Sequence, residues 1–197
     1  MQGLGSGAIS LYGNSKQKQN ILEEVSAGRM IAGFALSEPD AGSDVAAMSS
    51  KAYSTSEGWK VNGEKSWISN GGIADYYTFF AKTSDQPGSG GISAFLLEAD
   101  NPGLFIAVRQ EVMAPHPLAR LQLKDAKLSR QALLGDEGKG FGIAMATLNI
   151  FRPTVGAAAL GFARRALDDI LHYSGNRNMY GQTMQYMLVV RSHLGEM

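Results

Sequence analysis

The sequence contains no cysteine, so it offers no disulfide, no thiolate nucleophile and no thiolate metal ligand. Histidine is scarce, and the three residues (His116, His172 and His193) lack ligand spacing, which favours packing or surface roles over a metal site. Basic and acidic residues balance at 18 each, which argues against nucleic-acid or membrane-surface binding. No uninterrupted apolar run approaches the roughly 20 residues of a membrane span, and the first residues do not resemble a secretory signal.

What is present is an ordinary globular composition. The chain has 197 residues, of which 44% are hydrophobic, enough for one domain with a core or one domain plus part of another. From about residue 30 to residue 134, short apolar runs alternate with Gly, Pro, Asp and Ser, which is typical of strands joined by turns. The predicted strands are 30–36, 51–55, 59–61, 65–68, 76–81, 92–97, 104–108 and 121–127.

Two turns are predicted between these strands. Ser56-Glu57-Gly58 indicates one hairpin, and Asn62-Gly63 is the strongest short hairpin signal, so it predicts a tight turn between 59–61 and 65–68. Many short strands without intervening helices favour an antiparallel β-barrel or sandwich.

Helical patterns flank the strands on both sides. Residues 15–27 predict a helix capped by Asn14 or Ser15 and ended by Gly28. A helical period resumes at Gly140, where Pro153 is expected to kink the helix or to begin a new segment, and a second helix is expected over 182–197. The fold class predicted is therefore α+β.

One segment carries a chemical signal, because a buried strand ends in a turn rich in hydroxyl groups. Pro39 must end the strand, since it has no N–H, and Gly42 allows a backbone to approach a ligand. The hydroxyls of Ser37 and Ser43 and the free N–H groups of such a turn suit a phosphate-bearing cofactor. A plain surface turn remains the alternative. The full segment is Gly33-Phe34-Ala35-Leu36-Ser37-Glu38-Pro39-Asp40-Ala41-Gly42-Ser43-Asp44.

A second segment follows roughly twenty residues later, and the two together resemble the acyl-CoA dehydrogenase family of flavoproteins. It reads Val61-Asn62-Gly63-Glu64-Lys65-Ser66-Trp67-Ile68-Ser69-Asn70-Gly71-Gly72. The resemblance covers nearly the whole chain in the family's order. It continues through Phe95-Leu96-Leu97-Glu98, Asn101-Pro102-Gly103, Leu134-Gly135, Gly138-x-Gly140-Phe141, Arg152, Gly161-x-Ala163-x-x-Ala166-Leu167 and Arg177-x-x-Tyr180-Gly181.

This resemblance implies a division into three parts. Residues 1–29 would be the remnant of an N-terminal helical domain, 30–135 the middle β-domain, and 136–197 part of a C-terminal four-helix domain. The apolar pattern still runs at residue 197, so we expect the chain to be a piece of a longer protein.

The resemblance also implies an FAD site. The first segment would hold the isoalloxazine ring and the pyrophosphate, and Trp67 would cover part of the ring, with Ser69 near the flavin N5 atom. Arg177 would reach the pyrophosphate of a neighbouring subunit, which implies a homodimer or homotetramer. A core aromatic is the alternative for Trp67, and a helix-end arginine is the alternative for Arg177. The residues implied for FAD are Phe34, Leu36, Ser37, Gly42, Ser43, Trp67, Ile68, Ser69 and Arg177.

For the acyl-CoA substrate, the resemblance implies Ser43, Leu148, Asn149 and Arg152. Asn149 replaces a carboxylate that is common in the family, and Leu188 stands where the family has a glutamine near the flavin. One branch of the family has its glutamate base immediately before the arginine, where this chain has Phe151, which cannot accept a proton. The sequence therefore supplies no catalytic residue that we can name.

The function expected is α,β-dehydrogenation of an acyl-CoA thioester with hydride transfer to FAD, with an electron-accepting flavoprotein as a possible partner. Two alternatives stay open: a catalytically inactive FAD- or CoA-binding or assembly module, and an acyl-CoA oxidase or reduced-flavin monooxygenase of the same fold. The family's habit implies a cytoplasmic location, or the mitochondrial matrix in a eukaryote.

Overall fold

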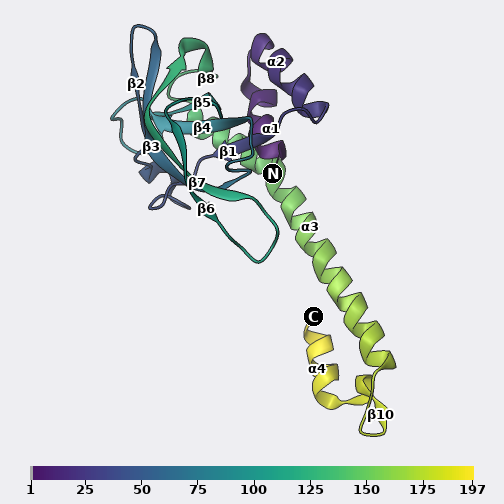
Figure 1. Ribbon diagram of the computed structural model, residues 1–197. Coiled ribbons are helices and arrows are strands. Elements are labelled where there is room, and N and C mark those ends of the chain that lie inside the picture. Colours follow the sequence, from purple (N-terminus) through teal and green to yellow (C-terminus); the bar gives the residue numbers. More distant parts are fainter. Residues whose placement is uncertain (1) are drawn as a thin grey trace. The chain divides into compact units, whose positions relative to one another are not determined.

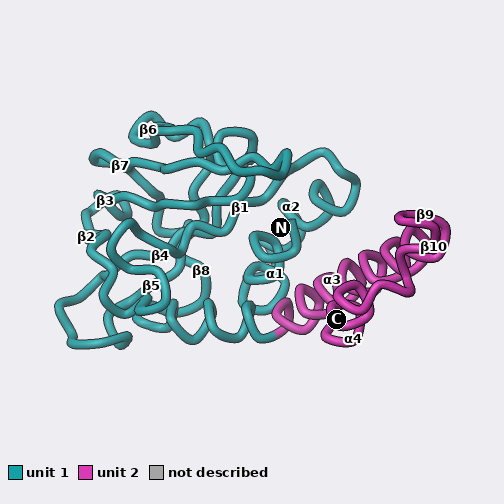
Figure 2. The backbone as a smooth tube through the Cα atoms, turned by 90° about the horizontal axis from the view of Figure 1, so that it is seen from below, with its two compact units in different colours: residues 1–149 teal, residues 150–197 magenta. Residues whose placement is uncertain are grey.

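The computed structural model describes residues 2–197 and divides the chain into two compact units, 1–149 and 150–197 (Figure 2). The first unit begins with two helices, α1 (Gln2–Tyr12) and α2 (Ser15–Ser26), followed by a β-sheet (Figure 1). The strands are β1 (Ala32–Ala35), β2 (Lys51–Ser54), β3 (Gly58–Ser69), β4 (Tyr76–Lys82), β5 (Ile92–Glu98), β6 (Leu104–Gln110), β7 (Leu118–Ser129) and β8 (Leu133–Leu134).

The sheet has eight strands, seven of them in the order β6-β7-β3-β2-β4-β5-β8, with β1 added beside β4. Most neighbours are antiparallel, but β1 and β2 both pair with β4 in the parallel sense. The chain thus has the α+β fold that the sequence predicted, with a mostly antiparallel sheet followed by a long helix.

The sheet is buried on both faces at β4. On one face, Tyr77 and Phe79 belong to a core shared with β3, β5 and β7. On the other face, Tyr76 and Phe80 pack in a second core with residues of α1 and of the helix that follows the sheet. Burying a large apolar side chain stabilises the fold by about 1.5–3 kcal/mol, so these two cores fix the strands that carry the motif segments.

The predicted Asn62-Gly63 hairpin is wrong, because β3 runs straight through it. Here the partner strand β7 carries a bulge, with Asp125 at φ 49°. Asn62 Nδ2 donates to Asp125 Oδ1 at 3.0 Å and Asn62 Oδ1 accepts from Asp125 N at 2.8 Å. Gly63 is required because Ser50 packs directly against it. The same dipeptide therefore serves a bulge instead of a turn.

Gly63→Ala is expected to destabilise the protein by about 1–3 kcal/mol, because it overpacks a close backbone contact. A Cβ atom at this position would lie 2.7 Å from Ser50 Cα. The free energy of unfolding in urea measures the effect. Gly142→Ala is the control, since nothing lies within 4 Å of its Cβ position, and an unchanged or higher stability is expected there. Equal stabilities of the two variants would contradict this packing argument.

The helices near the N-terminus were predicted only in part. α2 has the expected cap, with Asn14 and Gln17 forming a capping box, and Gly28 follows it with φ 72°. α1 was missed because its glycine-rich sequence has a low intrinsic helix propensity. Packing overrides that preference: α1 buries Ala8 and Ile9 in the second core.

The long helix α3 (Gly140–Asn176) starts in the first unit and continues through Pro153, so no new segment begins there. A proline removes a single intrahelical hydrogen bond, and the neighbouring bonds maintain the helix. A short hairpin, β9 (Asn178–Met179) and β10 (Gln182–Thr183), precedes α4 (Leu188–Glu196), which starts six residues later than predicted.

α3 also has the length and mean hydropathy that a membrane-crossing helix needs. This was not predicted, because no uninterrupted apolar run is long enough. The observation is weak evidence for a membrane span, since core helices of many proteins have the same length and composition.

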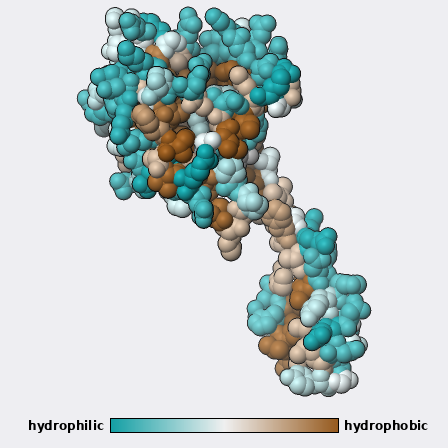
Figure 3. Space-filling view, in the orientation of Figure 1, coloured by the Kyte–Doolittle hydropathy of each residue, from teal (hydrophilic) through white to brown (hydrophobic). Residues whose placement is uncertain are grey.

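β6 lies at one end of the strand order and is an edge strand. Its side chains Phe105, Ile106 and Val108 are exposed. The surface of the first unit carries apolar side chains gathered in patches among hydrophilic ones (Figure 3).

Candidate functional site

The two motif segments lie side by side in the first unit. Ser66 N donates to Ser37 O at 2.9 Å, and Asn70 Nδ2 donates to Ala32 O at 2.8 Å. The start of β1 and the turn after it are thereby joined to the end of β3, although some thirty residues or more separate the partners along the chain. The groups that the sequence singled out in each segment therefore belong to one region of the structure.

A buried ion pair joins the segments more strongly. Lys65 Nζ lies 2.8 Å from Glu38 Oε1, and both side chains are almost fully buried. The ammonium also donates to Leu36 O at 3.1 Å, and it stands 5.1 Å from the centroid of the Phe79 ring. Breaking such a pair would leave an uncompensated charge in the core, so the pair holds the Ser37-Glu38-Pro39 turn against β3.

Glu38 is the better compensated partner. It accepts four hydrogen bonds, from Lys65 Nζ, Ser50 N, Ser49 N and Ser49 Oγ. Burial by itself would raise the pKa of Glu38, but the Lys65 charge and these hydrogen bonds outweigh burial and lower that pKa to about 2. For Lys65, burial is the larger effect and lowers the pKa to about 8, although Glu38 opposes it. The lowered pKa favours the charged form of Glu38 and disfavours the charged form of Lys65, because Lys65 has fewer polar partners.

The Glu38 carboxylate is expected to make the free energy of unfolding depend on pH in the acid range. The pKa of Glu38 in the folded protein lies below its ordinary value of 4.5, so its contribution is complete above about pH 5 and is lost as the pH falls toward 2. We expect a loss of about 2 kcal/mol between pH 5 and pH 3 that is specific to Glu38. Urea unfolding at both pH values would measure it. In Glu38→Gln this component should vanish, and an identical acid dependence in both proteins would contradict the assignment.

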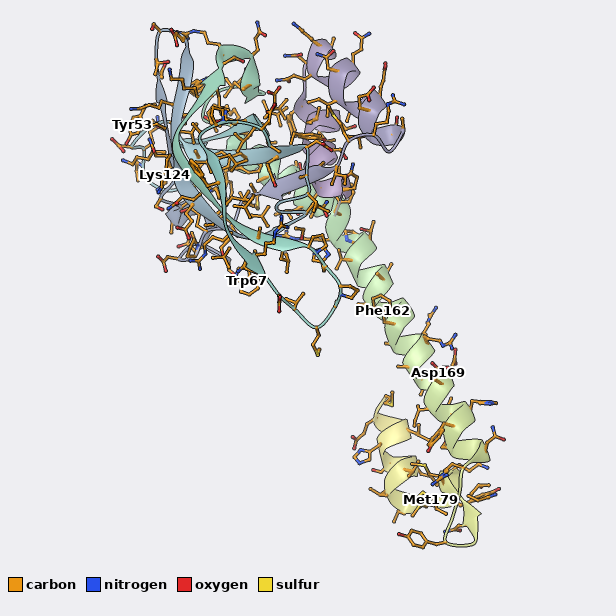
Figure 4. The ribbon with its side chains drawn as sticks, viewed as in Figure 1. Tyr53, Trp67, Lys124, Phe162, Asp169 and Met179 are labelled. Atoms are coloured by element: carbon orange, nitrogen blue, oxygen red, sulfur yellow. The ribbon has the colours of Figure 1, made fainter. Side chains whose placement is uncertain are left out.

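Trp67 is directed outward by a second bulge. Between the pairs Lys65–Leu121 and Ile68–Ala119, β3 has one residue more than β7. Trp67 takes φ 59° there and is 60% exposed, and Figure 4 shows it beside the β6–β7 connection. Bulges commonly redirect a side chain next to a functional site. The alternative interpretation of Trp67 as a core aromatic is therefore excluded.

The turn after β1 presents unpaired donors. Within residues 2–197, the N–H groups of Gly42 and Ser43 and the hydroxyls of Ser37 and Ser43 have no hydrogen-bond partner in the protein. Gly42 and Ser43 are exposed, and nothing lies within 4 Å of the Gly42 Cβ position. Free donors of this kind suit an anionic group, and an exposed indole on the strand paired with this turn suits a flat aromatic group.

Three of the predicted side chains are packed inside the protein and are less accessible to a ligand than those of Trp67 and Ser43. Phe34 packs edge-on against Phe80, with ring centroids 5.0 Å apart. Leu36 and Ile68 are buried in the cores. These positions can contribute main-chain groups, but the buried side chain of Ile68 cannot cover a ring.

The remaining predicted residues lie on or after α3. Leu148 is half-buried and Asn149 is exposed, both at the end of the first unit. Arg152 is exposed on α3 in the second unit. Arg177 is exposed just after α3, where its N–H donates to Tyr173 O at 2.9 Å. The ligand roles of these four residues stay predictions.

The β6–β7 connection, which the sequence did not assign to the site, is attached along the end of β3. Gln110 Oε1 accepts from Trp67 N at 2.9 Å, and Asn70 N donates to Pro117 O at 2.9 Å. Between these two points, His116 Nε2 lies 2.9 Å from Ser69 Oγ. The Pro-His-Pro sequence could have signalled a rigid loop, but nothing in it indicates the strand end that it meets.

The fold and this site define a class: an α+β protein whose sheet carries exposed polar groups and an exposed indole. Two family models match the chain, "Acyl-CoA dehydrogenase, middle domain" over residues 33–126 and "Acyl-CoA dehydrogenase, C-terminal domain" over residues 138–197. Together they cover well over half of the sequence. The chain belongs to the acyl-CoA dehydrogenase family.

Similar proteins agree with this assignment. The human short-chain specific acyl-CoA dehydrogenase, mitochondrial, is 35% identical over 193 residues, which are 97% of this chain and 47% of the relative. The structure of butyryl-CoA dehydrogenase from Megasphaera elsdenii matches with a TM-score of 0.92 and 35% identity, over 98% of this chain and 51% of that one. The FAD complex of PigA matches with a TM-score of 0.93 and 28% identity, over 98% and 51%. The chain spans about half the length of the curated relatives that it matches.

Proposed function

We propose that this chain is the flavin-binding part of an FAD-dependent acyl-CoA dehydrogenase that forms an α,β double bond in an acyl-CoA thioester. The observation that supports the proposal is the main-chain pairing of Ser66 with Ser37, which joins the turn with unpaired donors to the strand that carries the exposed Trp67. When bound, FAD supplies a two-electron acceptor at its N5 atom. Relatives named as acyl-CoA dehydrogenases support the substrate class.

Each part of the site has a separate role in this proposal. Gly42 and Ser43 donate hydrogen bonds to the pyrophosphate, and Ser37 donates its hydroxyl hydrogen bond to the ring system. Trp67 stacks against the ring and excludes water from one side. Ser69 places its hydroxyl near the flavin N5 atom, where a donor tunes the electron affinity of the ring.

The substrate and partner assignments follow the family resemblance. Leu148, Asn149 and Arg152, with Ser43, would contact the acyl-CoA, and Arg177 would bind the pyrophosphate in a neighbouring subunit through its planar guanidinium. The site is then shared between chains in a homodimer or homotetramer. An electron-accepting flavoprotein is the expected partner, and the cytoplasm or the mitochondrial matrix is the expected location.

The proposal is tested by titrating the purified chain with FAD while following flavin fluorescence and measuring the mass in solution. A bound, quenched flavin in a dimer or larger assembly is expected. Arg177→Ala should weaken FAD binding in the oligomer, whereas Arg164→Ala, the matched control on α3, should not. A chain that binds no FAD would overturn the proposal. If Arg177→Ala weakened FAD binding equally in a chain shown to be monomeric, the shared site would be overturned.

One alternative has a specific observation in its favour. Phe151 occupies the position of the base in one branch of the family and cannot take a proton, which favours an FAD- or CoA-binding module without turnover of its own. Flavin reduction by an acyl-CoA substrate under anaerobic conditions separates the two. Bound FAD that no acyl-CoA reduces would support the binding module.

A further inference from the structure

The hydroxyl of Ser69 has a single protein partner within the described chain, the imidazole of His116. The two atoms, Ser69 Oγ and His116 Nε2, are 2.9 Å apart. His116 is half-buried and is the central residue of the β6–β7 connection's attachment to β3. Its main chain is fixed on both sides, since His116 N donates to Ala114 O at 2.7 Å and Pro117 O accepts from Asn70 N.

A neutral imidazole can pair with a hydroxyl in either direction of the hydrogen bond. In one neutral tautomer Nε2 carries the proton and donates to Ser69 Oγ, and in the other Nε2 accepts the Ser69 proton. The flavin N5 atom has the matching property: it accepts a hydrogen bond in the oxidised ring and carries a hydrogen that it can donate in the reduced ring. A hydroxyl between the two must reverse its own direction on reduction.

We propose that His116 is a positioning residue that allows the Ser69 hydroxyl to reverse its hydrogen bond when the flavin is reduced; this rests on the FAD site proposed above. With oxidised FAD, His116 Nε2–H donates to Ser69 Oγ, and Ser69 O–H donates to N5. With reduced FAD, N5–H donates to Ser69 Oγ, and Ser69 O–H donates to His116 Nε2. Ser69 keeps both of its hydrogen bonds in the two states, and the half-buried imidazole changes tautomer by releasing its Nε2 proton to solvent and taking one from solvent at Nδ1.

Loss of the imidazole should therefore weaken the binding of reduced FAD more than the binding of oxidised FAD. Without His116, the oxidised state loses a bond that Ser69 Oγ received, whereas the reduced state leaves the Ser69 proton without an acceptor. An unpaired buried donor is the more costly of the two. In His116→Phe, which keeps a flat ring, we expect the affinity for reduced FAD to fall about tenfold relative to that for oxidised FAD. For a two-electron couple this lowers the midpoint potential by about 30 mV.

The test is the midpoint potential of bound FAD in four proteins: the unaltered chain, His116→Phe, Ser69→Ala and the double variant. The potential should fall in His116→Phe, while in the Ser69→Ala background the same substitution should change nothing. If His116 only maintained the shape of the loop, His116→Phe would shift the midpoint potential equally with Ser69 and with Ser69→Ala. That result would overturn the proposal. An unchanged potential in His116→Phe would overturn it too. If the unaltered chain binds no FAD, the proposed function fails and this proposal fails with it.

A second measurement requires no substitution. Nitrogen NMR of the labelled chain with FAD reports which ring nitrogen of His116 carries the proton. We expect protonated Nε2 with oxidised FAD and unprotonated Nε2 after reduction with dithionite. The same tautomer in both states would contradict the proposal, while FAD affinity, measured separately, would remain evidence for the site itself.

Discussion

Lys65→Met is expected to destabilise the protein by about 3–5 kcal/mol, because it leaves the Glu38 carboxylate buried without its counter-charge. The side chain of Glu38 is only 3% exposed and that of Lys65 is fully buried, so water cannot replace the lost partner. Met fills a similar volume, so the expected loss comes from charge more than from a cavity. Equilibrium unfolding in urea at pH 7 measures the difference in the free energy of unfolding.

The chain provides a matched control in an exposed ion pair. Lys60 Nζ lies 3.3 Å from Asp125 Oδ1, with side chains 46% and 69% exposed, and Lys60→Met should cost no more than about 1 kcal/mol. The double variant Lys65→Met, Glu38→Gln should recover part of the stability, since it removes both charges. A cost of Lys65→Met as small as that of Lys60→Met would show that the buried pair does not fix the turn.

Trp67→Ala is expected to raise the dissociation constant for FAD by about 10–100-fold, equivalent to about 1.4–2.8 kcal/mol. Lost stacking and lost apolar contact with the ring are the cause. The stability of the ligand-free protein should hardly change, because the Trp67 side chain is already 60% exposed. Alanine retains the cost of the positive φ at this position, so the substitution isolates the side chain.

Tyr53→Ala is the control for the loss of an exposed aromatic side chain. Tyr53 is 52% exposed on β2 and lies on another part of the sheet from Trp67 (Figure 4). Fluorescence titration should give an unchanged FAD affinity for Tyr53→Ala. An affinity that is also unchanged in Trp67→Ala would remove Trp67 from the proposed site.

The sequence was sufficient for those features that short segments determine. Apolar runs and their bounding turns placed the main strands, and Asn14 marked the start of α2. Asn62-Gly63 was misread because a dipeptide that favours a turn also suits the partner of a bulge, and the choice depends on β7, some sixty residues away. The helix α1 was missed because tertiary packing compensates for its glycines.

The sequence indicated which residues belong to the candidate site, but it did not indicate how they are arranged in space. Glu38 and Lys65 were visible within the motifs, but their pairing depends on the approach of β1 to β3. The outward direction of Trp67 follows from a register shift that no local pattern contains. His116 was expected only to pack or to lie at the surface, and its contact with Ser69 arises only once β6 and β7 have paired.

The edge strand β6 has a consequence for work with the protein in solution. An edge with exposed Phe105, Ile106 and Val108 can add a strand from a second molecule and so promote self-association. Association of this kind grows with protein concentration and is indifferent to flavin and to Arg177. A mass that keeps rising with protein concentration is therefore expected from this edge, on top of any assembly of fixed size at a shared ligand site.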